Sequence, residues 1–239
     1  MESLVKVMAL LPWPDWLAVV VFFGGWAGYA WFARHRADTR PSILATTNRI
    51  RRQWMLQATY RDVRVVDGVM IQNLSTSPSF FASTTVLVIG GLLAVLGTTD
   101  KASELVREIP FAARTSVLVF DLKVVLMLVV FVYAFFRFTW SMRQYTFGAL
   151  LIASAPEAKQ FDALGAEGDT RRQAFADKAG RVVGLAAETF NDGLRAYYFA
   201  FAAIGWFFSP LVFVLATLGV IYILYQREFH SDVLEGLNA

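Results

Sequence analysis

The stretch Phe120–Phe138, FDLKVVLMLVVFVYAFFRF, decides the fold of this chain. Its charged residues stand near its two ends, and the apolar run between them is long enough to cross a hydrocarbon layer of about 30 Å as a helix. Three further stretches share this character, at about 16–32, 79–98 and 199–225. In lipid, a single helix of this kind satisfies its own backbone hydrogen bonds. The sequence therefore predicts an all-α integral membrane protein with four transmembrane helices and amphipathic, extended cytoplasmic helices.

The bulk composition agrees with this fold class and narrows the chemistry. Of the 239 residues, 56% are hydrophobic, and none is a cysteine, which excludes disulfides and thiolate metal sites. The sequence has no phosphate loop, no paired-histidine metal motif and no nucleophile elbow, so we expect neither an enzyme nor a bound cofactor or metal. It also has no basic run interleaved with aromatic residues, so nucleic acid is not an expected partner.

Lysine and arginine are unevenly distributed among the segments between the spans. Of the 22 such residues, eight lie in block 34–78, seven in block 139–197 and five on the other side of the spans. By the positive-inside rule, both blocks are cytoplasmic helical blocks and both termini lie outside. We therefore expect one multi-pass membrane domain, residues 1–239, in the bacterial inner (plasma) membrane. In this topology His35 and His230 face opposite sides of the membrane and cannot share a cofactor.

The first block contains an amphipathic segment at Ser42–Tyr60. Apolar residues recur there at helical spacing and form one face, to which Trp54 belongs. Arg49 and Arg52 point away from that face. Such a helix fits the surface of the lipid bilayer, with its Trp in the headgroup layer and its Arg residues on anionic lipid headgroups. It fits a buried docking surface for a partner as well, and the sequence leaves both interpretations open.

The second block returns to helical periodicity after residue 169. Val182 and Phe190 lie on its apolar stripe and are a candidate partner interface. Asp177 and Arg181 stand at i,i+4 on its polar side, the spacing of a helical ion pair. This helix either runs straight into the fourth span or breaks at the turn-prone triplet 191–193.

Two Ser-Pro pairs mark boundaries or bends. Ser77-Pro78 has the pattern of a helix cap and first helical residue at the start of the second span. Ser209-Pro210 lies midway along the fourth span, where proline removes one backbone hydrogen bond, frees a carbonyl near Trp206 and kinks the helix. Such a kink either lines a path for ions or only fits the packing.

Three charged residues are candidate pore or ligand contacts. Asp121 and Lys123 lie within the third span, close to its outer edge, and their i,i+2 spacing points them to different helix faces. They are either anchors and structural ion-pair members or part of a pore mouth. Arg64 belongs to a charged cluster just inside the membrane, which indicates lipid headgroup binding with local salt bridges, an anion vestibule or a partner dock.

The residues of several segments together resemble a known family. They are Arg40-Pro-Ser-Ile43 with Asn48, Arg52, Trp54 and Met55; Ile71-Gln-Asn-Leu74 leading to Ala82-Ser83; and Gly193-Leu-Arg-Ala-Tyr-Tyr198, Gly205-Trp206, Pro210 and Arg227-Glu-Phe229. In this pattern the chain resembles the uncharacterised membrane protein family catalogued as domain of unknown function 599, over residues 15–235. The resemblance implies four spans and carries no activity.

Two functions fit these features. We expect a non-catalytic accessory or scaffold subunit that assembles through its helices, because the centre of the third span, Val124–Val132, has no polar group for a transport path. The alternative is a homo-oligomeric channel or transporter-like protein. Gly24 and Gly28, a small-xxx-small pair in the first span, allow close helix approach in either assembly. The expected partners are the lipid bilayer with its anionic headgroups, further copies of the chain, or another membrane subunit.

Overall fold

The computed structural model describes residues 11–36, 41–108 and 116–238, and all regular secondary structure in these ranges is helical. The helices are α2 (Trp13–Arg36), α3 (Ile43–Ala58), α4 (Val65–Gly97), α5 (Thr99–Glu108), α6 (Val117–Ala153), α7 (Ala158–Asp162), α8 (Ala166–Ile204), α9 (Pro210–Phe229) and α10 (Asp232–Asn238). Four helical segments are long and apolar enough to cross a membrane: Trp13–Arg36, Val65–Gly97, Val117–Ala153 and Pro210–Asn238. The predicted all-α fold with four candidate spans is confirmed.

The chain divides into two compact units, each assembled from three separate stretches of sequence. The first unit takes its residues from Met1–Arg36, Thr85–Ala134 and Leu194–Arg227, and the second from Ala37–Thr84, Phe135–Gly193 and Glu228–Ala239. The long helices α4, α6 and α8 each contribute to both units. The second unit contains most of the two polar blocks that the sequence placed together on one side of the membrane.

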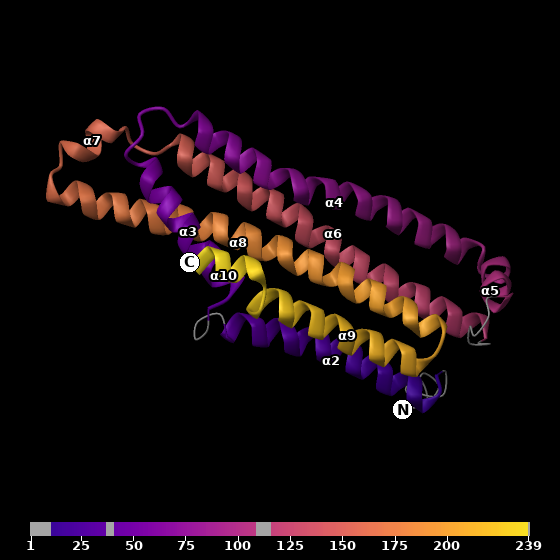
Figure 1. The fold of residues 1–239 in the computed structure, drawn as a ribbon. Coiled ribbons are helices and arrows are strands. Elements are labelled where there is room, and N and C mark those ends of the chain that lie inside the picture. The colour runs from indigo at the N-terminus through magenta and orange to yellow at the C-terminus, as the bar shows by residue number, and fades with distance from the viewer. Residues whose placement is uncertain (1–10, 37–40, 109–115, 239) are drawn as a thin grey trace, which may run out of the picture. The chain divides into compact units, whose positions relative to one another are not determined.

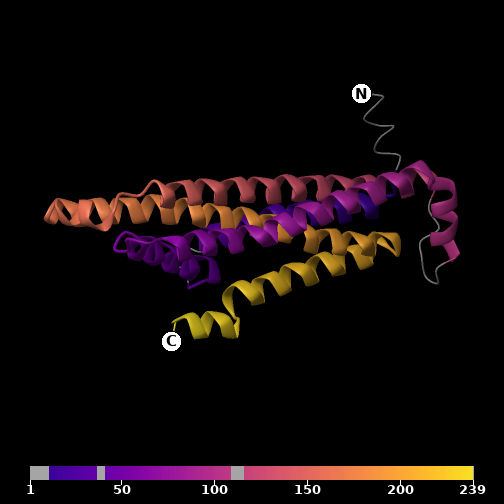
Figure 2. The ribbon, with the colours of Figure 1, turned by 90° about the horizontal axis from the view of Figure 1, so that it is seen from above.

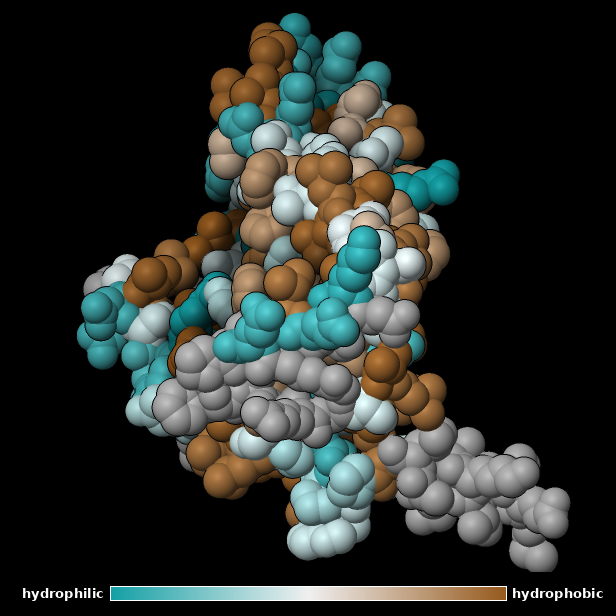
Figure 3. Space-filling view, turned by 90° about the vertical axis from the view of Figure 1, so that its right-hand side faces the viewer, coloured by the Kyte–Doolittle hydropathy of each residue, from teal (hydrophilic) through white to brown (hydrophobic). Residues whose placement is uncertain are grey.

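The first unit is built around aromatic rings. The Phe22 ring of α2 lies 5.6 Å from the Phe199 ring of α8 and 5.0 Å from the Phe213 ring of α9, measured between centroids. Many other large apolar side chains of this unit, such as Leu87 and Leu211, are exposed, and apolar side chains reach the molecular surface in Figure 3. An apolar surface on long apolar helices is what a lipid-facing bundle requires. At the far end of α4, the short helix α5 turns across the axis of α4 (Figures 1 and 2).

The second unit has a continuous core to which α3, α4, α6 and α8 contribute. Its buried members are Met55, Ile71, Tyr145, Ile152, Ala176, Ala179, Val183 and Ala186. Small residues let the helices approach closely: an ideal Cβ at Gly148 of α6 would lie 2.8 Å from a methyl group of Val183. The two blocks that are far apart in sequence thus share one hydrophobic core.

Helix α4 runs unbroken through Pro78 from Val65 to Gly97. The prediction that the second span starts at Ser77-Pro78 is therefore wrong as a helix boundary. Proline is tolerated inside long membrane helices because packing around it compensates for the one missing backbone hydrogen bond, and Pro78 is buried. The helical pattern that precedes Ser77 in the sequence belongs to the same helix.

The predicted fourth span, residues 199–225, is not one helix. Helix α8 passes straight through residues 191–193, ends at Ile204, and a 3₁₀ turn at Gly205–Phe207 leads to α9. The Arg227 Nη1 atom of α9 donates a hydrogen bond to the Tyr198 hydroxyl of α8 at 2.5 Å. A straight helix would separate these two residues by about 43 Å. The chain therefore reverses, as Figure 1 shows, and the prediction of a kinked single span is corrected to a tight helical hairpin.

The C-terminal end packs on the first polar block. The Leu44 backbone N–H donates to Glu228 Oε1 at 3.0 Å, and Arg49 Nη2 donates to Asn238 Oδ1 at 3.1 Å. Since α3 belongs to block 34–78, the C-terminus lies on the same side as that block. The prediction that both termini lie on the side opposite this block is wrong for the C-terminus. The argument that separated His35 from His230 by topology fails with it.

This topology can be tested with single cysteines, because the native chain has none. We expect Gly236→Cys near the C-terminus to react with a membrane-impermeant maleimide from the same side as Ser154→Cys. Both should react from the side opposite Lys101→Cys in α5, since the candidate span Val65–Gly97 lies between block 34–78 and α5 in the sequence. All three positions are exposed. Labelling of Gly236→Cys together with Lys101→Cys would contradict the hairpin.

Candidate functional site

The break between α8 and α9 creates a local need for hydrogen bonds. The Ser209 Oγ atom accepts a hydrogen bond from the Val212 backbone N–H at 3.1 Å, so Ser209 caps α9 and Pro210 takes its first helical position. Proline has no N–H to donate to the carbonyl of Trp206, four residues earlier. This carbonyl is buried with its residue and needs a donor from elsewhere.

Lys123 of α6 supplies that donor. Its Nζ atom lies 2.8 Å from the Trp206 carbonyl oxygen and 5.6 Å from the centroid of the Trp206 ring. The ring nitrogen of Trp206 in turn donates to Asp15 Oδ1 of α2 at 2.6 Å. Lys123 is 2% exposed and Asp15 is 7% exposed. A buried amine and a buried carboxylate thus share one tryptophan, and this group, called the Trp206 cluster below, ties three helices together.

Asp121 makes a separate contact at the same end of α6. Its Oδ1 atom accepts a hydrogen bond from the Thr99 hydroxyl at 2.8 Å, which joins the start of α5 to α6. Asp121 and Lys123 thus reach different partners, as their i,i+2 spacing predicts. Both side chains are engaged inside the chain, which favours the structural interpretation over a pore mouth.

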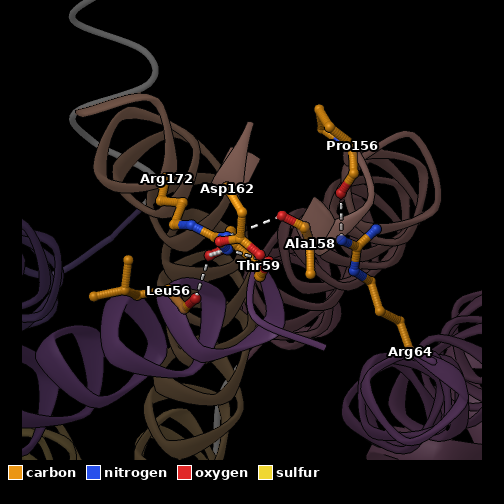
Figure 4. A network of polar contacts seen from close by, with 7 residues as sticks. All are labelled: Leu56, Thr59, Arg64, Pro156, Ala158, Asp162 and Arg172. Carbon is orange, nitrogen blue, oxygen red and sulfur yellow. Dashed lines mark hydrogen bonds and ion pairs between the residues drawn. The ribbon is translucent and has the colours of Figure 1, made fainter. Parts of the chain in front are cut away.

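Arg64 is engaged by backbone carbonyls (Figure 4). Its Nε donates to Ala58 O at 2.9 Å, its Nη1 to Ala155 O at 2.7 Å and its Nη2 to Pro156 O at 2.5 Å. Ala58 is the last residue of α3, where carbonyls lack intrahelical donors, and Ala155 and Pro156 lie in the connection between α6 and α7. Arg64 therefore caps α3 and ties it to this connection, and its three nitrogens are not available to a ligand in this arrangement.

A second arginine, Arg172 of α8, also donates hydrogen bonds to backbone carbonyls. Its role was not predicted from the sequence. It is 1% exposed, and its guanidinium lies 4.1 Å from the Tyr60 ring centroid and 4.7 Å from that of Phe161. It donates to Thr59 O, Ala158 O and Asp162 Oδ1, at 2.5, 3.0 and 2.7 Å (Figure 4). Nothing in the sequence separates it from Arg171, its exposed neighbour.

The amphipathic helix α3 packs on the rest of the second unit. Trp54 Nε1 donates to Asp67 Oδ1 at 2.7 Å, and Arg61 Nη1 donates to the same oxygen at 2.5 Å. Asp67 is fully buried. Of the two interpretations that the sequence left open for Trp54, the geometry favours docking, here against the chain's own α4.

Val182 and Phe190, the predicted partner interface on α8, are both half-buried within the chain. The Phe190 ring lies 5.8 Å from the Phe81 ring and 5.7 Å from the Phe138 ring, between centroids. These contacts lie in the chain's own core and leave less of Phe190 for a partner. Among the residues that the structure describes, no group of three or more His, Cys, Asp or Glu side chains is arranged to hold a metal ion.

Comparison with known proteins identifies the family. The family described as "Protein of unknown function, DUF599" matches residues 17–233, so the chain belongs to this family. No curated protein and no solved structure matches the chain. The predicted resemblance is confirmed, and membership brings no assigned activity with it.

The Trp206 cluster predicts a stability effect at Lys123. Lys123→Met keeps the length of the side chain but leaves the Trp206 carbonyl and the Asp15 carboxylate without this amine. We expect it to lower the free energy of unfolding by about 2 kcal/mol, measured in detergent by denaturant titration. Lys101→Met, on the exposed surface of α5, is the matched control and should change little. Equal stability of the two variants would contradict the role given to Lys123.

The two neighbouring arginines of α8 provide a second test. Arg172→Leu removes a buried cation from three hydrogen-bond acceptors and two rings, and we expect a loss of about 3 kcal/mol in the free energy of unfolding. Arg171→Leu removes only an exposed i,i+4 pair with Glu167 and should cost less than about 0.5 kcal/mol. Thermal melts of both variants followed by circular dichroism decide this. A comparable loss of stability in both variants would show that the buried contacts of Arg172 do not stabilise the fold.

Proposed function

We propose that this protein is a non-catalytic scaffold or accessory subunit of the bacterial inner membrane that assembles through the lipid-facing helices of its first unit. In this proposal the second unit is cytoplasmic, as the positive-inside count supports. With the C-terminus on the cytoplasmic side, Arg227 joins the inner residues and only four Lys and Arg residues stay outside. The reversal after Ile204 then requires the apolar end of α8 to enter the membrane as a further crossing.

The observation that carries the proposal is an open groove between α2 and α9. It has a volume of about 540 Å³, and its lining includes Gly24, Gly25 and Gly28 of α2 with Leu218 and Tyr222 of α9. An ideal Cβ at Gly24 or Gly28 meets no atom within 4 Å, and both residues are exposed. Glycine weakens a helix, so two exposed glycines one turn apart favour a contact outside the subunit.

Gly25 shows what an internal glycine of the same helix looks like. An ideal Cβ there would lie 2.8 Å from the Ile221 Cδ1 atom of α9, so its missing side chain lets α2 and α9 pack against each other. Gly24 and Gly28 have no such contact within the described residues. The groove is therefore formed by the α2–α9 pair and is open to a further helix.

The charged residues of the first unit support a scaffold more than a channel. Lys123 and Asp121 are engaged by Trp206 and Thr99, and the centre of α6, Val124–Val132, has no polar group. A conduction path needs polar groups near the midplane. The homo-oligomeric channel stays the alternative, and ion flux through purified protein in liposomes tests it directly.

The three glycines allow the proposal to be tested with matched variants. We expect Gly24→Leu with Gly28→Leu to abolish the assembly of protein extracted from its own membranes, seen as a loss of mass by native mass spectrometry. The thermal stability of the subunit should be kept, because these positions are open. Gly25→Leu should instead lower stability, through its contact with Ile221. Val86→Leu, at an exposed position on α4 that already carries a side chain, is the control and should leave assembly intact.

The composition of the native assembly separates the possible outcomes. A single homo-oligomeric mass supports a scaffold of identical copies, and a stoichiometric unrelated subunit supports an accessory role. A monomeric mass for the wild-type protein, with no bound subunit, would overturn the proposal. Ion conductance that is lost with the assembly would favour the channel instead.

A further inference from the structure

Helices α3 and α8 cross at unusually short range in the second unit. An ideal Cβ at Gly180 would lie 2.9 Å from the Arg52 Cα atom, and one at Gly184 would lie 2.9 Å from Asn48 Oδ1. Gly180 and Gly184 are one turn apart on α8 and face α3 together. The two glycines therefore set the position of Asn48 and Arg52 on the surface of α8.

A polar cleft of about 300 Å³ opens at this crossing. Besides the two glycines it is lined by Asn48 and Arg52 of α3 and by Arg181, Leu185 and Glu188 of α8. Two arginine residues from different helices thus line one small space. All seven residues belong to the second unit.

Neither of these arginines is engaged within the described part of the chain. Arg61 and Arg64 of the same unit bind Asp67 and backbone carbonyls, whereas Arg52 and Arg181 make no hydrogen bond or ion pair there. The i,i+4 pair that the sequence predicted for Arg181 is not formed in the described chain, where Asp177 Oδ1 accepts a hydrogen bond from Gln173 Nε2 at 3.4 Å. Both arginines are exposed, so their charges are open to an anion from outside the chain.

Glu188 marks the other end of the cleft. Its Oε1 atom accepts a hydrogen bond from Asn48 Nδ2 at 2.9 Å, and Asn48 Oδ1 accepts one from Arg51 Nη1 at 2.9 Å. Burial lowers the pKa of the Arg51 guanidinium below its ordinary value, and the charges of Tyr145 and Glu188 oppose this change. Arg51 and Asn48 thus stabilise the Glu188 carboxylate, and neither Arg52 nor Arg181 has a counterion among the residues that the structure describes.

We propose that this cleft binds a phosphate ester that also carries a hydroxyl or ammonium group. The guanidinium forks of Arg52 and Arg181 match the oxygens of a phosphate. The Glu188 carboxylate accepts a hydrogen bond from the hydroxyl or ammonium group at the other end. The volume admits one such group and excludes a large nucleotide cofactor. The chemistry is shared by phospholipid headgroups and small soluble phosphate esters, and the site is independent of how the subunits assemble.

The test uses the full-length protein in a maltoside detergent, which carries no phosphate that could occupy the cleft. Glycerol 3-phosphate serves as the soluble probe in isothermal titration calorimetry, and mixed micelles with added phosphatidylglycerol serve as the lipid probe in thermal melts. We expect saturable binding of at least one probe, weakened at least tenfold by Arg52→Gln and by Arg181→Gln. Arg143→Gln, at an exposed arginine of α6 in the same unit, is the matched control and should bind as the wild type does.

A further variant distinguishes binding inside the cleft from a general effect of its positive charge. Leu185→Trp fills the cleft without altering any charge, and it should weaken binding as the arginine variants do. Since neither Arg52 nor Arg181 makes a polar contact in the described chain, their variants should melt at the wild-type temperature. Binding of the soluble probe identifies a free ester, and stabilisation by phosphatidylglycerol alone identifies a lipid headgroup. The proposal is overturned if neither probe binds, if Arg143→Gln weakens binding equally, or if Leu185→Trp leaves binding unchanged.

Discussion

Backbone groups without helical partners are costly in a membrane protein, and the hairpin between α8 and α9 is organised around one of them. Pro210 begins α9 and leaves the carbonyl of Trp206 without an amide donor. Lys123 reaches that carbonyl from α6, and Asp15 of α2 accepts from the indole of the same tryptophan. Each charge is matched within the cluster, so burial costs less than it would for an isolated ion. The reversal of the chain, the position of α6 and the start of α2 all depend on this arrangement.

In the second unit, arginine side chains supply the hydrogen bonds to backbone carbonyls that lack helical donors. Arg64 and Arg172 place their planar guanidinium groups on carbonyls at the end of α3, in the connection between α6 and α7 and at the start of α7. Figure 4 shows the contact of Arg64 with Pro156 and that of Arg172 with Ala158. Lysine, a single point charge, would serve one such carbonyl, whereas the guanidinium serves several in fixed directions. The arginines that a positive-inside count treats as equivalent therefore differ in kind. Some cap helix ends, whereas Arg52 and Arg181 make no polar contact within the residues that the structure describes.

Three of the four spans and the association of the two polar blocks follow from the sequence, because bilayer thickness sets helix length and charge sets sidedness. The hairpin does not follow, since residues 199–225 are apolar on both sides of the turn and hydropathy carries no direction. The freed carbonyl near Trp206 was predictable from Pro210 alone. Its donor was not, because Lys123 is 83 positions away and only tertiary packing brings it there. Arg172 was missed because its chemistry is identical to that of its exposed neighbour Arg171.

The glycines connect this packing to function. Some glycines are required by the internal packing, because a Cβ atom there would clash with a neighbour. Gly25 packs in this way against Ile221, and Gly193 against the Phe138 ring. A glycine with open space around it destabilises its helix, and no packing contact inside the subunit compensates for this. In α2, Gly24 and Gly28 are of the second kind, and they lie beside Gly25, on a groove wall completed by α9. The internal packing of the first unit therefore does not account for these two glycines, and the proposed assembly through the groove would account for both.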